Sequence, residues 1–359
     1  MAKRSAASEP SLEALQKLAK GIIEKYSKNG ELKVQVPVRG TGNITYDKKL
    51  RQYVLAGKTK ELDVHNLASS KAFTQRAWLV WFISRELVSA DKSATLRDLF
   101  YSAQAYNLNF EEQGSSDQAI YDIEAMIGMP RESMHIFPEE RSAIYGEMVI
   151  QYTDPKYKSK QHNLSDHPDG VSVGPALTEA KFVSCKADKV LVVEKNAIFT
   201  RFVEDEAYKK FNAIVFGLGG QAPRNARVLV RRLNQELGLP VYIFCDADPY
   251  GAHIASVVIS GSAAASHLTG LATPDAVWAG VYPSDIKRYD LPSDPLKEVD
   301  IKRLEDMKRD PRYASGVWKK ELEVFAKEKR KTELEAFAKH KLSFLVDEYL
   351  PERLKELGK

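Results

Sequence analysis

Four apolar runs in the second half of the chain constrain its fold most strongly. They cover residues 190–194, 213–218, 241–246 and 277–282, and a segment with helical periodicity follows each of the first three. Continuous apolar runs of this length are typical of strands buried on both faces, and their alternation with helices is typical of a parallel sheet. This part of the chain is therefore predicted to form an α/β domain.

Three acidic residues stand where two of these predicted strands end. Glu194 closes the first run, and Asp246 and Asp248 close the third. The carboxyl ends of parallel strands share one edge of a sheet, so the three carboxylates are expected to converge there. Carboxylate oxygens suit a hard cation such as Mg²⁺, which keeps part of its coordination free for phosphate oxygens. The pattern favours a magnesium site, and the alternative is that each acid only caps the following helix.

A glycine-rich loop and an arginine stripe lie between these acids in the sequence. The loop contains Gly219 and Gly220 and precedes a helix, so its backbone N–H groups are expected to face phosphate. Its spacing is not that of a nucleotide-hydrolysing P-loop. On the helix, Arg224, Arg227 and Arg231 fall within an arc of about 60°, opposite an apolar face. The stripe is predicted to bind DNA phosphates, and a merely solvated helix face is the alternative.

The first half of the chain shows a different pattern. Helical runs at 73–89, 95–105 and 116–127 precede strand candidates at 134–137 and 143–151, which is the order of a winged helix-turn-helix. We expect a winged-helix domain at 71–152, a polar linker and domain entry at 153–185, and the α/β domain with a helical C-terminal elaboration at 186–359. Residues 1–70 are expected to form an extension, whose helix at 11–26 either packs on its own domain or docks a partner.

Tyr101 is the candidate nucleophile of the first half. Thr95 and Asp98 form a capping-box pattern at the start of the second helix, and Tyr101 points away from the apolar face of that helix. Arg97 lies one turn before Tyr101 on the same side. A free phenol, with a pKa near 10, is a poor nucleophile at neutral pH, and a neighbouring guanidinium favours the phenolate. Most helix tyrosines do no chemistry, so position alone leaves the role of Tyr101 open.

Composition narrows the class of protein. The 359 residues carry 53 basic and 49 acidic side chains, so any DNA-binding surface must come from local basic regions. No apolar run approaches the ~20 residues that span a bilayer, and no signal segment opens the chain. Cys185 and Cys245 both lie inside apolar runs, which argues against a disulfide framework or a cysteine zinc site. A cytoplasmic, DNA-associated protein without a membrane partner is expected.

Five segments together resemble one family. They are Arg-Asp-Leu-Phe-Tyr at 97–101, Leu-Val-Val-Glu-Lys at 191–195, the glycine and arginine segment 217–232, Asp-Ala-Asp-Pro-Tyr-Gly at 246–251 and Gly-Val-Tyr-Pro-Ser-Asp at 280–285. In this order they resemble the A-subunit family of type IIB DNA topoisomerases, which includes archaeal topoisomerase VI and the meiotic double-strand-break protein. The resemblance covers about residues 70 to 350.

The resemblance implies a CAP-like winged helix followed by a Toprim domain, and an isomerase that relaxes or decatenates DNA. Tyr101 would attack a DNA phosphorus and form a 5′-phosphotyrosine link, while Arg97 would favour the phenolate or hold the phosphate. Glu194, Asp246 and Asp248 would hold Mg²⁺, and Glu194 would alternatively act as general acid or base. Implied partners are double-stranded DNA, a second copy of this chain and an ATPase B subunit of the GHKL type, in an A2B2 heterotetramer.

Other functions remain open from the sequence. A dedicated break-forming protein of the same family would cut without strand passage, and a Toprim nuclease would use the acids without Tyr101. A non-catalytic DNA-bridging protein would need neither the acids nor Tyr101.

The third helix of the expected winged unit is a poor DNA-binding surface, because Asp117, Asp122 and Glu124 would face DNA. Either Arg97, Arg131 and Arg141 make the DNA contacts, together with the second domain, or the helix boundaries differ from those expected.

Overall fold

The chain divides into two compact units. The computed structural model describes residues 8–138, 141–154, 156–158 and 160–358. The N-terminal unit contains the described residues up to 45, together with 53–138 and 263–269, and the C-terminal unit contains 46–52, 141–262 and 270–358. Each unit has its own apolar core. Among the residues that the structure describes, no helix is long and apolar enough to cross a membrane.

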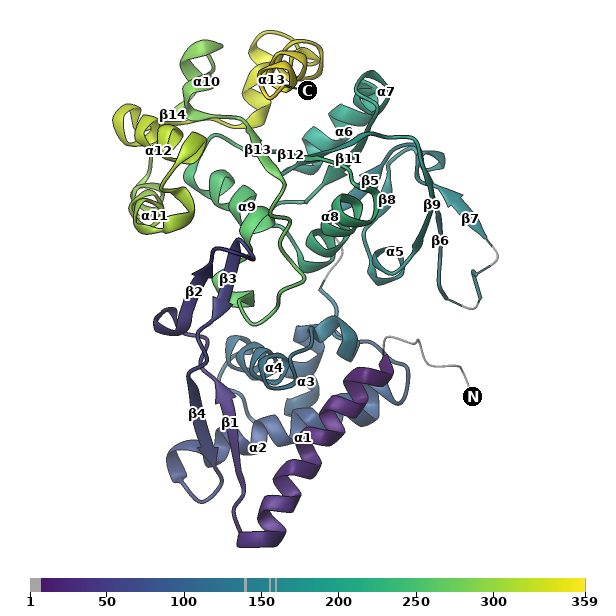
Figure 1. The fold of residues 1–359 in the computed structure, drawn as a ribbon, viewed down its shortest axis with the longest axis vertical. Helices are drawn as coiled ribbons and strands as arrows, with labels where there is room; N and C mark the ends of the chain where they lie inside the picture. The colour runs from purple at the N-terminus through teal and green to yellow at the C-terminus, as the bar shows by residue number, and fades with distance from the viewer. Residues whose placement is uncertain (1–7, 139–140, 155, 159, 359) are drawn as a thin grey trace. The chain divides into compact units, whose positions relative to one another are not determined.

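Helices dominate the N-terminal unit (Figure 1). Its elements are α1 (Ser8–Asn29), β1 (Lys33–Pro37), β4 (Thr59–Asp63), α2 (Leu67–Phe82) with a π-helical continuation (Ile83–Val88), α3 (Leu96–Ala105) and α4 (Gln113–Ile127). Strands β1 and β4 pair antiparallel. A hairpin of β2 (Ile44–Asp47) and β3 (Gln52–Leu55) lies between them in the sequence. The three helices expected at 73–89, 95–105 and 116–127 are therefore confirmed within a few residues.

The N-terminal 70 residues are not a separate extension. Leu12 and Leu15 of α1 belong to the same apolar cluster as the buried faces of α2, α3 and α4. This is the own-domain packing that the sequence offered as one alternative for the helix at 11–26. Only the end of α1 leaves large apolar side chains exposed, with Ile23 61% and Tyr26 53% accessible.

The expected β-hairpin at 134–137 and 143–151 is wrong. Residues 131–134 form a 3-10 turn, and Ile136 makes an isolated parallel bridge with Ala94. Strand β5 (Ala143–Tyr145) pairs instead with β11 (Ala213–Gly217) of the C-terminal unit, where Ile144 is fully buried. Strand β6 (Met148–Gln151) pairs with β7 (Gln161–Asn163) and β9 (Lys181–Cys185). Residues 143–151 therefore belong to the C-terminal core, which buries more of their apolar surface than a solvent-exposed wing would.

The acidic residues of α4 hold the N-terminal unit together. The Asp122 carboxylate accepts from Arg76 Nη2 at 2.6 Å and from Arg39 Nη2 at 2.9 Å, and all three side chains are at least nine-tenths buried. Glu124 accepts the Arg131 backbone N–H at 2.6 Å and contacts His267 Nε2 at 3.3 Å. The helix boundaries are close to those expected, and Asp122 and Glu124 are buried against other residues of this unit, so these two acids do not form a DNA-facing surface.

The C-terminal unit contains a six-stranded sheet in the order β13-β12-β10-β11-β5-β8. Four of these strands are parallel and match the four apolar runs. They are β10 (Lys189–Val193), β11 (Ala213–Gly217), β12 (Val241–Phe244) and β13 (Val277–Gly280). The parallel sheet is thus confirmed, with antiparallel β5 and β8 (Val171–Ser172) added at one edge.

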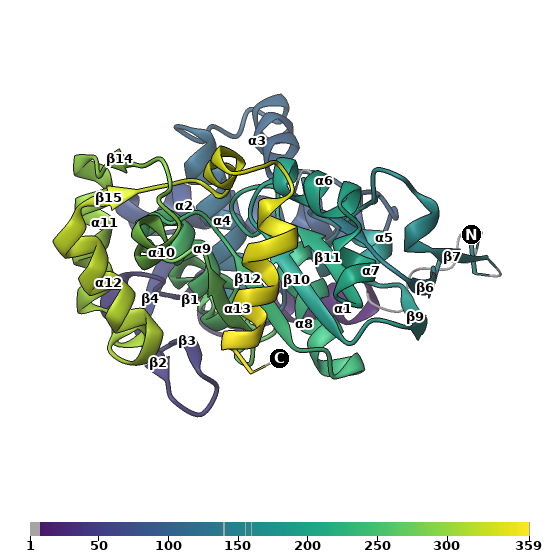
Figure 2. The same ribbon diagram turned by 90° about the horizontal axis from the view of Figure 1, so that it is seen from above.

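Two helical layers cover this sheet. Side chains alternate between its faces, so Val190 and Val192 enter one apolar cluster while Leu191 and Val193 enter the other. Helices α8 (Arg224–Leu237), α9 (Pro249–Ser260) and α12 (Gly316–Glu328) pack on the first face. Helices α6 (Asn196–Glu204), α7 (Ala207–Lys210) and α13 (Leu350–Glu356) pack on the second, where α13 lies across the sheet (Figure 2).

The expected linker is part of this unit. Within 153–175, β7 (Gln161–Asn163) pairs with β6, β8 pairs with β5, and Leu164 and Val173 are buried in the core. After it come α5 (Pro175–Thr178) and β9 (Lys181–Cys185). The polar composition misleads because short edge strands need few apolar residues to pair.

The segment at 280–285 ties the C-terminal helix to the sheet. Asp285, at the start of α10 (Pro283–Arg288), accepts from Tyr349 Oη at 2.8 Å and from Arg353 Nη2 at 2.5 Å. The Arg353 guanidinium also lies 4.3 Å from the Tyr282 ring centroid. This segment therefore has a structural role, which is to anchor the C-terminal helix to the sheet. Helix α11 (Glu298–Arg309) completes the C-terminal elaboration.

Replacing Asp122 with alanine tests the role of α4. Removing this carboxylate leaves Arg39 and Arg76 buried without their shared counter-charge, and we expect a loss of about 3 kcal/mol or more in the free energy of unfolding. Urea unfolding of the purified chain measures it. Glu111, whose side chain is 83% exposed in its ion pair with Lys71, provides the control, because Glu111→Ala should change stability by less than about 1 kcal/mol. Equal losses in the two variants would contradict the assignment.

Candidate active site

Helix α3 presents Tyr101 to solvent from a well-defined N-terminus. Thr95 and Asp98 form the expected capping box, with the Asp98 N–H donating to Thr95 Oγ1 at 3.1 Å and the Thr95 N–H to Asp98 Oδ2 at 2.8 Å. Leu99 and Ala103 bury the opposite face completely. Tyr101 is 51% exposed, which confirms its expected place on the polar side of the helix.

Arg97 contacts this tyrosine one helical turn earlier. Its Nη2 donates to Tyr101 Oη at 3.4 Å, and the guanidinium carbon lies 5.7 Å from the ring centroid. Both residues are exposed, so the pair is accessible to a large ligand. A guanidinium here favours negative charge on the phenol oxygen and offers further N–H donors to a phosphate.

The acidic residues lie at the carboxyl ends of neighbouring strands β10 and β12, as expected. Glu194 Oε2 accepts the backbone N–H of Asp246 at 3.1 Å, which joins the two strand ends directly. Asp248 caps α9 by accepting the Gly251 N–H at 2.6 Å. Asp248 therefore does cap a helix, as the alternative proposed. The Glu194 side chain instead accepts a hydrogen bond from the backbone at the end of the neighbouring strand.

A C-terminal segment crosses the same strand ends. We call residues 330–335 the strap. The Thr332 N–H donates to the Ala247 carbonyl at 3.1 Å, and the Leu334 N–H donates to Asp246 Oδ1 at 2.9 Å. In the strap, Lys331 pairs with buried Asp300 at 2.7 Å. The strap thus supplies hydrogen bonds and one cation next to the acids.

Lys195 provides the other cation. Its Nζ lies 3.0 Å from Asp246 Oδ2, 3.0 Å from Glu333 and 3.1 Å from Glu335. Sequence reasoning missed Lys195 and the strap as parts of the site. Lys195 directly follows Glu194, so its place in the sequence could have identified it as part of the site. The strap lies more than eighty residues after Asp248, and only the fold places it next to the acids.

Burial and mutual repulsion raise the pKa values of these acids. Burial, with a contribution from the nearby Asp246 charge, raises the pKa of Glu194 to about 7. Burial also raises the pKa of Asp246 to about 6, although the Leu334 N–H and Lys195 favour its charged form. Burial likewise raises the pKa of Asp248 above its ordinary value. Although burial opposes it, hydrogen bonding to Asp246 and the strap acids raises the pKa of Lys195. The positive charge of Lys195 and Lys331 therefore offsets the burial of these acids only in part.

The side chains of Glu194, Asp246 and Asp248 are chemically suited to bind a divalent cation. They offer only carboxylate oxygens, the ligands that Mg²⁺ prefers, and their raised pKa values show unmet demand for positive charge. Among the described residues, however, no three acidic, histidine or cysteine side chains are already arranged around one metal position. Asp246 is instead bonded to Lys195 and to the strap.

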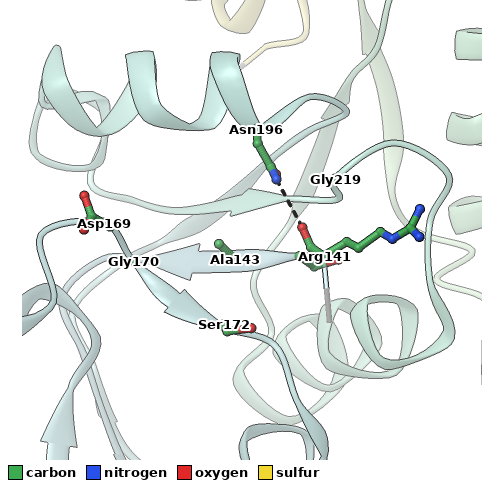
Figure 3. A pocket seen from close by; sticks show the side chains of 8 residues that line it. Arg141, Ala143, Asp169, Gly170, Ser172, Asn196 and Gly219 are labelled. Carbon is green, nitrogen blue, oxygen red and sulfur yellow. Dashed lines mark hydrogen bonds between the residues drawn. The ribbon is translucent and has the colours of Figure 1, made fainter. Parts of the chain in front are cut away.

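The glycine-rich loop bonds to the backbone of Glu194 and also borders a pocket. The Gly220 N–H donates to the Glu194 carbonyl at 2.8 Å, and Gly219 helps to line a cavity of about 430 Å³. Figure 3 shows the Asn196 amide donating to the Arg141 carbonyl, and the Arg141 side chain pointing away from Asp169. Gly219 has a φ of +72°, and an added Cβ would lie 2.2 Å from the Arg141 carbonyl oxygen. Glycine is thus required at 219 by close backbone approach.

The arginine stripe on α8 is not an exposed phosphate-binding surface. Arg224 and Arg227 are 9% and 4% accessible. Arg227 Nε donates to the Leu271 carbonyl at 3.1 Å, and Arg231 donates to the Ala272 carbonyl. The loop 271–272 covers this face of the helix, which a helical-wheel argument has no means to foresee. Arg131 is also buried, against Tyr121 and Glu124.

Two family models match the chain. One, described as the Toprim domain of Spo11 and of the topoisomerase 6 A-subunit, covers residues 189–354. The other, described as type IIB DNA topoisomerase, covers residues 71–136. The first match contains β10, β12 and the strap, and the second contains α3.

Curated relatives align along nearly the whole chain, and each is named as the A-subunit of type 2 DNA topoisomerase 6. The relative from Methanothermobacter thermautotrophicus is 39% identical over 349 residues, which are 97% of this chain and 98% of the relative. The relative from Archaeoglobus fulgidus is 34% identical, with 97% of both chains covered. The relative from Pyrococcus abyssi is 34% identical, with 96% of this chain and 94% of the relative covered.

The raised pKa of Glu194 predicts a pH-dependent stability. Between its ordinary value of 4.5 and its folded value of about 7, the folded protein holds a proton that the unfolded chain has lost. Without metal, raising the pH from about 5 to about 8 should therefore lower the melting temperature through this group. Mg²⁺ binds the deprotonated acids, so it should raise the melting temperature more at pH 8 than near pH 5.

Scanning calorimetry of the wild type and of Glu194→Gln separates this contribution from that of other titrating groups. The glutamine side chain does not titrate, so the melting temperature of the variant should fall less over the same pH range. Identical pH profiles for the two proteins, with and without Mg²⁺, would contradict the proposed electrostatics of the site.

Proposed function

The chain belongs to the A-subunit family of type 2 DNA topoisomerase 6, and we propose that it cleaves DNA with Tyr101 as its nucleophile. The observation that carries this proposal is the exposed Tyr101–Arg97 pair on a helix whose start is capped and whose other face is buried. Within the family, relatives named as topoisomerases favour strand passage over break formation alone.

The reaction is a transesterification at a DNA phosphorus. Tyr101 Oη attacks the phosphorus and forms a phosphotyrosine bond to the 5′ side, while the bond to the 3′ oxygen breaks and that oxygen leaves as a hydroxyl. Arg97 favours the phenolate in the attack and offers donors to the phosphate oxygens. One phosphoester replaces another, so religation by the 3′ hydroxyl needs no additional energy source.

The acids at the ends of β10 and β12 support this step. We assign Glu194, Asp246 and Asp248 as ligands of a divalent cation, with Mg²⁺ as the expected ion. When bound, the cation would neutralise phosphate charge and stabilise the leaving 3′ oxygen. Alternatively, Glu194 would not hold the cation but would carry a proton to or from the 3′ oxygen, and without a bound cation its pKa of about 7 suits that role near neutral pH.

The proposed DNA-binding surface contains fewer residues than the sequence suggested. Helices α2, α3 and α4 are proposed to form a helix-turn-helix unit that delivers Tyr101 from α3, while α4 remains a core helix. The backbone of the loop at Gly219 and Gly220 remains a candidate for phosphate contact. The buried arginines of α8 are left out of this surface.

Assembly follows from the chemistry. Cutting both strands of a duplex needs two tyrosines, and a two-fold dimer of this chain would supply them symmetrically. Directed strand passage needs a motor, and the sequence has no P-loop pattern. Together with the family's A-subunit name and the resemblance, these points lead us to propose an A2B2 complex on double-stranded DNA in the cytoplasm, with an ATPase B subunit of the GHKL type.

Replacing Tyr101 with phenylalanine tests the assignment. Loss of one exposed hydroxyl should leave the free energy of unfolding within about 0.5 kcal/mol of wild type. Cleavage of supercoiled DNA by the complex with its ATPase partner should fall at least ~10³-fold. DNA binding, measured by fluorescence anisotropy, should stay within about threefold.

Tyr106→Phe is the matched control, because Tyr106 is 53% exposed and follows α3 directly. Its ring packs against Trp78 and Trp81, contacts that phenylalanine keeps. This variant should cleave at the wild-type rate. Covalent protein–DNA complexes in Tyr101→Phe, or their loss in Tyr106→Phe alone, would refute Tyr101 as the nucleophile.

A further inference from the structure

Lys195 occupies the place where the acidic strand ends most need positive charge. We propose that Lys195 is the resident counter-ion of Asp246, and that a divalent cation displaces it from Asp246 when the site is loaded. The inference rests on the proposed function in one respect, which is that the acids of β10 and β12 bind a cation.

Protein donors already engage both oxygens of Asp246. Its Oδ1 accepts the Leu334 N–H at 2.9 Å, and its Oδ2 contacts Lys195 Nζ at 3.0 Å. The Asp246 side chain is only 9% exposed, so a metal cannot approach it freely from solvent. The strap N–H is part of a backbone path anchored by buried Leu334, whereas the ammonium is at the end of a flexible side chain. The lysine contact is therefore the one that gives way.

The strap provides a place for the displaced ammonium. Lys195 Nζ also lies 3.0 Å from Glu333 and 3.1 Å from Glu335, and both of these acids are more exposed than Asp246. An ammonium has three N–H donors, and here each faces one carboxylate. Release from Asp246 frees one donor while the strap acids hold the other two. The freed N–H then lies beside the loaded site, where it suits a phosphate oxygen of the DNA backbone.

Lys331 distinguishes direct competition from a general effect of charge. It lies in the same strap, and its positive charge favours the charged form of Asp248. Its Nζ, however, pairs with Asp300 at 2.7 Å, which is not one of the proposed ligands. Removing Lys331 changes the charge near the acids without freeing an oxygen of Asp246.

The test is Mn²⁺ binding to the purified chain without DNA, measured by electron paramagnetic resonance. Lys195→Met should bind Mn²⁺ at least about tenfold more tightly than wild type, or about 1.4 kcal/mol. Lys331→Met should show a clearly smaller gain, and Lys195→Arg should stay near wild type because it keeps the charge. Equal gains in the two methionine variants, or no gain in Lys195→Met, would overturn the proposal.

A second measurement uses the wild-type chain, in case Lys195→Met fails to fold. Acetylation of individual lysines by a soluble active ester is followed by mass spectrometry with and without Mg²⁺. Lys195 should react faster when Mg²⁺ is present, whereas Lys210, paired with Asp347 at 2.8 Å on another part of the unit, should not change. An unchanged rate at Lys195 under Mg²⁺ concentrations that raise the melting temperature would contradict displacement.

Cleavage assays separate this inference from the proposed function. If the freed ammonium holds phosphate, Lys195→Met should need less Mg²⁺ for half-maximal cleavage yet cleave more slowly at saturation. Neither Mn²⁺ binding nor acetylation depends on Tyr101, so failure of the tyrosine assignment leaves both readouts intact. Failure of the acids to bind any cation would instead appear as an absence of Mn²⁺ binding in every variant.

Discussion

Burial of acidic side chains at the ends of two parallel strands is the constraint on which the C-terminal unit depends. Carboxylates removed from water need positive charge, hydrogen-bond donors or protons. The chain supplies all three, through Lys195, the backbone N–H groups of Asp246 and Leu334, and the raised pKa of Glu194. The C-terminal strap meets part of this demand, because its Leu334 N–H and its Lys331 ammonium lie next to acids that come much earlier in the chain.

The N-terminal unit meets the opposite requirement. Its proposed nucleophile, Tyr101, is exposed, and the buried polar contacts of the unit lie elsewhere. Asp122 and Glu124 of α4 direct their charge to buried partners, while α3 keeps Arg97 and Tyr101 at the surface. A capping box and a buried apolar face hold α3 in place without involving the tyrosine. We therefore expect substitution of the proposed nucleophile to cost little stability and substitution of Asp122 to cost much more.

Local patterns predicted well those features that depend on neighbouring residues in the sequence. The apolar runs gave four parallel strands, the Thr95–Asp98 spacing gave a real capping box, and the helix period placed Tyr101 on the exposed side. Glu194 and Asp246 also lie next to each other, as expected for residues at the carboxyl ends of neighbouring parallel strands. In each case the determining geometry is the repeat of a single element or of adjacent strands.

Predictions failed where distant segments decide the outcome. Residues 143–151 were expected to form a wing strand because they follow three helices, but residues 143–145 pair with β11 and join the C-terminal core. The arginines of α8 lie opposite an apolar face, yet the loop 271–272 covers them. The contacts of Lys195 with Glu333 and Glu335 join residues about 140 positions apart. No periodicity within one element carries information of this kind.

The central claim is that Tyr101 becomes covalently joined to DNA in a reaction that depends on the acids of β10 and β12. The most direct measurement is to stop the cleavage reaction with denaturant, digest the DNA and the protein, and sequence the nucleotide-bearing peptide by mass spectrometry. We expect the peptide that contains residues 97–101, with a 5′-linked nucleotide on Tyr101, to form with Mg²⁺ in wild type and to be absent in Asp246→Ala. A nucleotide on any other residue, or equal adduct yield in the Asp246 variant, would contradict the claim.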